Sequence, residues 1–140
     1  MHVTRFRVQN YARVPDLDIE VRNHLVLVGP NDVGKSSLLR CLDFLLGART
    51  AQLYATIAPE DVRDPDQPLV IEADLEGFLP HQEALFPDEI TVQAGGRKSL
   101  TLRMTASFDA EDTLTVDRTA PDGGTGRQLS REQLAGLGWQ

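Results

Sequence analysis

The sequence lacks several features that would place the protein in particular classes. It contains one cysteine, Cys41, which excludes an internal disulfide and a cysteine-based zinc site. No apolar run approaches the roughly 20 residues of a membrane-spanning helix, and the longest, Leu25–Val28, has the length of a buried strand. The first residues, Met1–Arg5, lack the apolar stretch of a secretory signal. We therefore expect a cytoplasmic protein that does not associate with membranes, and a buried, structural role for Cys41.

Positive charge is also scarce and unevenly placed. The chain has 140 residues and a net charge of −7, of which residues 1–50 contribute +2 and residues 51–140 contribute −9. A segment as negative as residues 51–140 binds the phosphate backbone of a nucleic acid poorly. If DNA is the ultimate substrate, we expect most of its binding surface to lie elsewhere. The length predicts one domain, residues 1–140.

Hydrophobic periodicity predicts a mixed order of elements. A hairpin of residues 3–8 and 17–21 around a turn at 10–15 should lead to a buried strand at 25–28 and a helix at 36–46. The leucines of that helix share one face: Leu38, Leu39, Leu42, Leu45 and Leu46. Residues 48–68 are typical of a loop with one helical turn near 59–62. Strands should follow at 69–75, 100–108 and 113–119, with short helices at 80–87 and 130–137. This order differs from the regular strand–helix alternation of a Ras-like GTPase.

The motif that carries chemistry is Gly-Pro-Asn-Asp-Val-Gly-Lys-Ser at residues 29–36, which fits G-x-x-x-x-G-K-[ST]. Its glycines let the backbone curl, so that successive N–H groups face phosphate oxygens. Lys35 supplies a positive charge to the β- and γ-phosphates, and the Ser36 hydroxyl can bind Mg²⁺. A predicted strand before the loop and a predicted helix after it provide the context that this phosphate-binding loop requires. The helix N-terminus adds unpaired N–H groups and partial positive charge.

The surroundings of this loop resemble a known family. Asn10-Tyr11, about twenty residues before the loop, resembles the start of ABC-type head domains of the SMC and RecF kind. Asn31-Asp32 in the loop, Phe44–Gly47 after it and Pro59–Val62 further on are most similar to the OLD family of ATP-dependent endonucleases. That family includes the nuclease subunit of Gabija-type phage-defence systems. The resemblance covers residues 1–78 well and the remainder only in general character.

The resemblance implies an α/β P-loop NTPase fold of ABC/SMC-head type, whose N-terminal lobe contains a mixed or antiparallel β meander. It implies ATP and Mg²⁺ as cofactors, DNA as a partner of the full-length protein, and a homodimer closed through the ATPase domain. A basic residue just after the Asn-Phe/Tyr pair reaches the nucleotide in related heads; here Ala12 holds that place and Arg13 follows, with a surface turn arginine as the alternative interpretation. The implied nucleotide-binding residues are Gly29, Asn31, Gly34, Lys35, Ser36, Ser37 and Arg13, with Ser36 as the metal ligand.

Other parts of an ATPase or nuclease site are missing from the sequence. The nearest candidate for a Walker B segment, Leu69–Asp74, fails because Glu72 interrupts the apolar run. Asp64-Pro65-Asp66 has the letters of a nuclease D-x-D motif but the setting of a solvated turn. Leu129–Gln133 faintly resembles the ABC signature L-S-G-G-Q, and Ser130 with Gln133 fits a helix capping box better. No catalytic residue is therefore assigned. We expect an incomplete N-terminal portion of a longer protein, with Walker B and a Toprim nuclease domain downstream.

Three hypotheses remain open at this point. The first is the ATP-binding segment of an OLD-like endonuclease, in which the nucleotide state regulates DNA processing in a role such as phage defence. The second is an SMC/RecF-type head that acts in DNA repair without nuclease activity. The third is a module that binds ATP and does not hydrolyse it. A phosphate loop does not read the base, so the preference for ATP rests on the resemblance and on the absence of the guanine-reading motif N-K-x-D.

Overall fold

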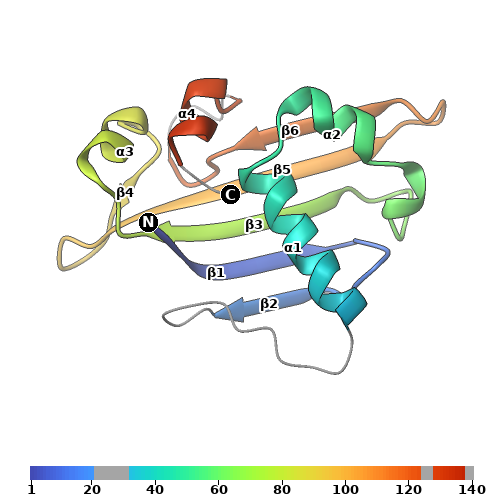
Figure 1. Ribbon diagram of the computed structural model, residues 1–140, viewed down its shortest axis with the longest axis horizontal. Helices are drawn as coiled ribbons and strands as arrows, with labels where there is room; N and C mark the ends of the chain where they lie inside the picture. Colours follow the sequence, from blue (N-terminus) through green and yellow to red (C-terminus); the bar gives the residue numbers. More distant parts are fainter. Residues whose placement is uncertain (21–31, 124–127, 138–140) are drawn as a thin grey trace.

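The computed structural model describes residues 1–20, 32–123 and 128–137, with the backbone alone for residues 32–36. Within these ranges, helices and antiparallel strands are interspersed (Figure 1). The strands are β1 (His2–Gln9), β2 (Leu17–Glu20), β3 (Leu69–Glu76), β4 (Thr91–Val92), β5 (Lys98–Phe108) and β6 (Leu114–Thr119). The helices are α1 (Asp32–Leu46), α2 (Thr50–Thr56), the 3-10 turn η1 (Pro59–Asp61), α3 (Pro80–Leu85) and α4 (Arg131–Gly136).

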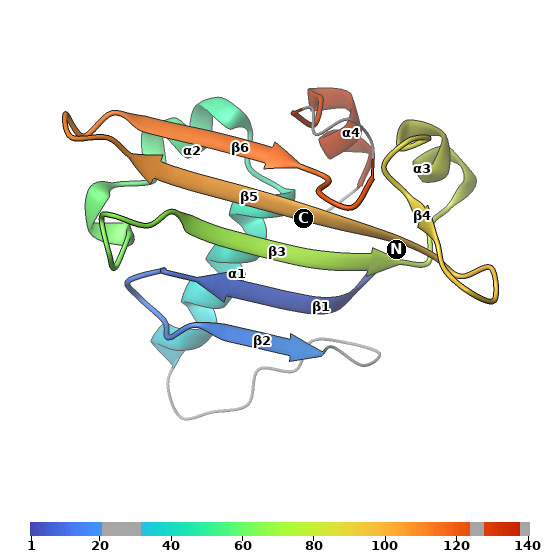
Figure 2. The same cartoon turned by 180° about the vertical axis from the view of Figure 1, so that it is seen from behind.

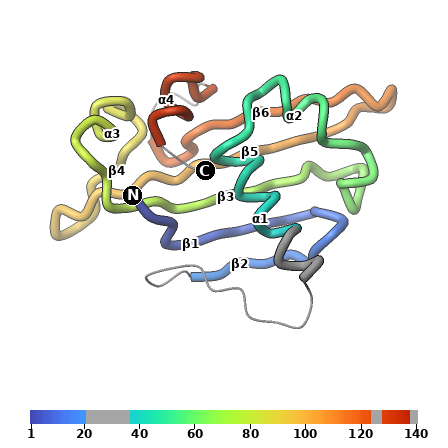
Figure 3. Tube along the Cα trace, in the orientation of Figure 1, coloured from blue at the N-terminus to red at the C-terminus, as the bar shows by residue number. Residues whose placement is uncertain are grey.

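All the described strands join one antiparallel sheet. Its order is β2-β1-β3-β5, and both β4 and β6 pair with β5. The hairpin β1–β2 is local, whereas β3 pairs with β1 after a crossover that contains α1 and α2 (Figure 3). Strands β3, β5 and β6 continue as a meander. The predicted hairpin and antiparallel meander are therefore confirmed, and the structure is a mixed α/β arrangement.

One face of the sheet forms the core, because side chains alternate between the two faces of each strand. Phe6 on β1 lies opposite Ala73 on β3, which lies opposite Leu102 on β5, and all three are buried. Helices α1 and α2 cover this face (Figure 1), and α1 contacts β3 and β5 while α2 contacts β6. The core therefore lies between the sheet and the helix that contains the end of the phosphate-loop motif.

The other face of the sheet carries no helix in the described part of the chain (Figure 2). Its centre is a charge network across three strands. Arg7 on β1 pairs with Glu72 and, at 3.1 Å, with Asp74 on β3. Arg103 on β5 donates to the second Glu72 oxygen at 2.6 Å, and Thr101 donates to Asp74 at 2.8 Å. These half-buried charges satisfy one another in cross-strand pairs.

Several element predictions need correction. Helix α1 is confirmed, but it begins at Asp32 rather than residue 36, and Leu39, predicted on its apolar face, is 52% exposed. Cys41 and Phe44 are buried on that helix instead. Helix α2 lies in a segment predicted as loop, whereas the turn near residues 59–62 is confirmed as η1. The predicted strand at 25–28 lies outside the described residues. Among the described helices, none is long and apolar enough to cross a membrane.

Candidate functional site

The described part of the candidate site begins with helix α1, which contains the second half of the phosphate-loop motif. Its backbone is helical from Asp32, so Gly34, Lys35 and Ser36 lie in its first turns. Gly29 and Asn31 lie outside the described residues, as do the side chains of Lys35 and Ser36. Ser37 is described and is buried, with 6% of its surface exposed. The roles of these residues toward phosphate and Mg²⁺ stay predictions.

The orientation of α1 suits an anion at its N-terminal end. A helix of this length carries partial positive charge and unpaired N–H groups at its first turn. In both views of the chain, that first turn lies beside the β1–β2 turn, residues 10–16 (Figures 1 and 2). The turn that contains the Asn10-Tyr11 pair and the described second half of the loop motif are therefore neighbours in space.

Asn10 holds the β1–β2 turn in place. Its φ is +65°, a left-handed conformation that asparagine tolerates better than most residues. Its side-chain amide donates to the carbonyls of Asp64 and Gln67, at 3.0 and 2.9 Å, and its carbonyl oxygen accepts from Asp64 N at 2.8 Å. Asn10 therefore fixes the segment after η1 against the turn. These hydrogen bonds account for the asparagine at this position.

Arg13 has a protein partner in this structure. Its Nε lies 3.2 Å from Oδ1 of Asp61 in η1. Asp61 is 2% exposed, and its other oxygen accepts from the Ala58 backbone N–H at 2.9 Å. The hydrogen bond to Asp61 raises the pKa of the Arg13 guanidinium above its ordinary value. The two motifs at residues 10–13 and 59–62 thus meet through this ion pair, which sequence reasoning missed. Contact of Arg13 with a nucleotide stays a prediction.

Tyr11 and Cys41 pack behind this turn. Both are fully buried, and Tyr11 forms an isolated antiparallel bridge with Val62. The Tyr11 hydroxyl has no hydrogen-bond partner among the described residues. Burial raises the pKa of the Cys41 thiol to about 12, so the thiol is neutral at physiological pH. The predicted structural role of Cys41 is confirmed.

Arg118 on β6 anchors the opposite end of α1. It is 3% exposed, and its guanidinium donates to the carbonyls of Phe44 and Ala48, at 3.4 and 2.5 Å, and to Thr50 Oγ1 at 3.0 Å. The last carbonyls of a helix lack partners within the helix, so Arg118 supplies donors from a strand about 70 residues away in sequence. No local pattern in the sequence indicates this contact.

The acidic groups of β3 and Asp64 of the D-x-D sequence have protein partners in the described part of the chain. Glu72 and Asp74 are taken up by the arginine pairs described above. Asp64 accepts from the backbone N–H of Asp66 at 3.0 Å, as expected of a turn. Among the described residues, no group of histidine, cysteine, aspartate or glutamate side chains is placed to hold a metal ion.

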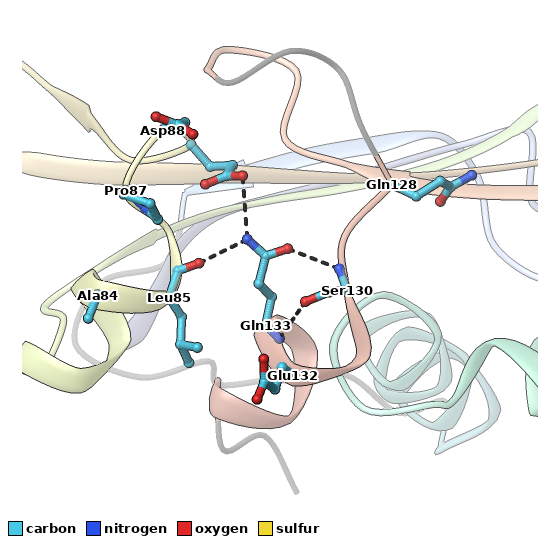
Figure 4. A pocket seen from close by; sticks show the side chains of 9 residues that line it. Ala84, Leu85, Pro87, Asp88, Gln128, Ser130, Glu132 and Gln133 are labelled. Atoms are coloured by element: carbon cyan, nitrogen blue, oxygen red, sulfur yellow. Dashed lines mark hydrogen bonds between the residues drawn. The ribbon is translucent and has the colours of Figure 1, made fainter.

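The sequence that faintly resembles an ABC signature is a helix cap (Figure 4). Ser130 Oγ accepts from Gln133 N at 3.1 Å, and Gln133 Oε1 accepts from Ser130 N at 2.9 Å. Gln133 Nε2 also donates to Leu85 O at 2.9 Å, which ties α4 to α3. The predicted capping box is confirmed. The hollow beside it, about 430 Å³, includes the acidic residues Asp88, Glu89 and Glu132 in its lining, which makes it unsuited to a phosphate.

Comparison with known proteins adds a family and two relatives. Residues 1–116 match the family described as AAA ATPase domain. The chain is 28% identical over 123 residues to the C component of the SbcCD nuclease of Deinococcus radiodurans, an alignment that covers 88% of this chain and 12% of that protein. It is 29% identical over 82 residues to the OLD nuclease of Thermus scotoductus, covering 59% of this chain and 16% of that protein. The chain thus spans a small fraction of either relative's length.

Proposed function

This chain belongs to the AAA ATPase domain family, and we propose that it is the ATP-binding N-terminal part of an OLD-like ATP-dependent endonuclease. The observation that carries the proposal is the G-x-x-x-x-G-K-S motif at residues 29–36, whose last residues open helix α1. The helix begins within the motif, at Asp32, and its first turn lies beside a turn held by Asn10. This arrangement suits a triphosphate.

Different residues of this chain would bind the phosphates and the Mg²⁺ ion. Backbone N–H groups of the loop and of the first turn of α1 would receive the phosphate oxygens, and Lys35 would neutralise charge on the β- and γ-phosphates. Ser36 would hold Mg²⁺, which supplies positive charge to the same phosphates when it is bound. Gly29, Asn31, Gly34 and Ser37 complete the proposed loop. Arg13, which pairs with Asp61, lies in the β1–β2 turn.

Hydrolysis and DNA processing belong to the longer protein in this proposal. Among the described residues, no group of three or more histidine, cysteine, aspartate or glutamate side chains is placed to hold a metal ion. We propose that residues 1–140 supply part of an ATPase domain and that the acids for Mg²⁺ and water lie in the longer protein. The OLD nuclease match supports a nuclease context. We propose that ATP closes a dimer of ATPase domains in the cytoplasm and thereby regulates DNA cleavage, in a role such as phage defence.

A second candidate is an SMC/RecF-type repair ATPase head without nuclease activity of its own. The longer alignment, 123 residues with one component of a nuclease complex, favours it. The two candidates share the ATP site and differ in the sequence expected downstream of residue 140. A downstream Toprim pattern of acidic residues would support the OLD-like protein, and a long heptad coiled coil would support the SMC/RecF-type head.

The test uses the longer protein that contains this chain. Cleavage of plasmid DNA is measured with Mg²⁺, with and without ATP, for the wild type, Lys35→Ala and Lys98→Ala. Lys98 is the matched control because it is the other lysine in the chain and, in the described part of the chain, pairs with the half-buried Glu83. We expect ATP to change the cleavage rate in the wild type and in Lys98→Ala but not in Lys35→Ala. DNA-stimulated ATP hydrolysis without cleavage would favour the repair head, and a response to ATP that survives Lys35→Ala would contradict both.

A further inference from the structure

A second hollow, which also borders α4, is lined by basic residues. Its volume is about 410 Å³, and it lies between the end of α1, the start of α2, β6 and α4. Its lining contains three arginines, Arg49, Arg118 and Arg131, and no aspartate or glutamate among the residues described. The hollow is therefore locally basic, although the chain as a whole has a net charge of −7.

The three arginines differ in the hydrogen bonds and ion pairs that they form within the protein. Arg118 forms the floor: a guanidinium has five N–H groups, and three donate to Phe44 O, Ala48 O and Thr50 Oγ1. Two therefore remain without an acceptor in the described part of the chain. Burial without a carboxylate partner also lowers the pKa of Arg118. Arg49 and Arg131 are exposed at the rim, and neither forms an ion pair with a described residue.

The chemistry of the hollow favours one class of ligand. Arginine presents a planar fork of donors that matches the oxygens of a phosphate. The remaining walls are largely apolar and include Leu46 and Leu134, and the volume lies in the range of small-molecule sites. An anion that carries an organic group fits these walls better than a bare ion. The carbonyl dipoles at the end of α1 oppose an anion, but Arg118 already donates to one of them, Phe44 O, and to Ala48 O just beyond the helix.

We infer that this hollow binds the phosphate group of a nucleotide, either free or within a DNA strand, as a site separate from residues 29–37. The two sites lie at opposite ends of α1, whose 15 residues span about 22 Å. A single triphosphate therefore cannot occupy both. The inference concerns a second ligand site and does not require the proposed function to be correct.

The test follows arginine side-chain N–H resonances by NMR while pyrophosphate is added to the Lys35→Ala protein, in which the loop at residues 29–37 is weakened. We expect the Arg118 Nε–H resonance to move saturably. The double variant Arg49→Gln/Arg131→Gln should weaken this binding by about tenfold or more, because each lost charged hydrogen bond matters at a partly desolvated site. Both side chains are exposed, so the fold should be unaffected.

The matched control is Arg5→Gln/Arg97→Gln, which removes the same charge at exposed positions that pair with Asp18 and Glu76. Unchanged affinity in this control supports a specific site. An Arg118 resonance that does not move, or an equal loss in both double variants, overturns the inference. Deoxythymidine monophosphate and a short oligodeoxythymidine are then compared: tighter binding of the strand assigns the site to DNA, and equal binding assigns it to a free nucleotide. With Lys35 intact, the part of Mg-ATP binding that Lys35→Ala removes, which reports on residues 29–37, should be the same in both double variants, and this separates the result from the proposed function.

Discussion

At the scale of single residues, Tyr11 combines complete burial with an unpaired hydroxyl. Among the described residues nothing accepts its proton, and a buried hydroxyl without a partner costs about 1–3 kcal/mol. Tyr11→Phe keeps the ring and removes that cost. We expect the free energy of unfolding in urea to stay the same or to rise by up to about 1 kcal/mol, whereas Tyr11→Ala should lose about 3–5 kcal/mol of packing. A clear loss of stability in Tyr11→Phe would mean that the hydroxyl has an acceptor after all.

Cys41 gives a prediction for alkaline pH. Its pKa is about 12 in the folded protein, against an ordinary value of 9.0. Below pH 9 both states keep the proton. Above it, the unfolded thiol ionises first, so the folded state loses up to about 1.4 kcal/mol of stability per pH unit until pH 12. Cys41→Ala should therefore show a shallower loss of stability above pH 9.

Because Cys41 is buried, a thiol reagent should label the native protein only at its rate of unfolding. Rapid labelling of native protein at pH 8 would refute the burial of Cys41.

At the scale of elements, Arg118 links β6 to the end of α1. Arg118→Leu removes three hydrogen bonds and leaves buried carbonyls without a donor, so we expect a loss of about 2–4 kcal/mol in the free energy of unfolding. Arg131→Leu is the control, because this exposed side chain forms no ion pair with a described residue and should change stability by less than about 0.5 kcal/mol. Chemical denaturation measures both. Equal effects of the two variants would show that Arg118 does not anchor the helix.

The secondary-structure elements also show which parts of the fold can be predicted from the sequence. Strands β3 and β5 were predictable, because apolar and polar side chains alternate along residues 71–76 and 100–108. The α4 cap was predictable from Ser130 and Gln133 alone. Helix α2 was missed because Leu53 is its one buried residue, which leaves no apolar periodicity to detect. The partners Arg13–Asp61 and Arg118–Ala48 were also missed, since both depend on segments brought together by the sheet.

At the scale of the whole molecule, two motifs far apart in the sequence meet at the β1–β2 turn. Asn10 reaches Asp64 and Gln67, and Arg13 reaches Asp61, so the turn before the phosphate loop and the segment after η1 form one unit. The resemblance to OLD-family and SMC-type ATPase regions, drawn from these same segments, is confirmed by the family match and the two relatives. Sequence alone located the candidate site because the loop motif is contiguous. It could not supply the groups that hold its surroundings together.

The most direct test of the central claim is the binding of Mg-ATP, measured by isothermal titration calorimetry. The wild-type protein and Lys98→Ala should bind with the same affinity, because Lys98 lies on β5 and pairs with Glu83. Lys35→Ala should bind at least about tenfold more weakly, since it removes a charged hydrogen bond to the phosphates. Circular dichroism should give the same spectrum for all three proteins. Mg-ATP affinity that is unchanged by Lys35→Ala would contradict the assignment of residues 29–37 as the nucleotide site.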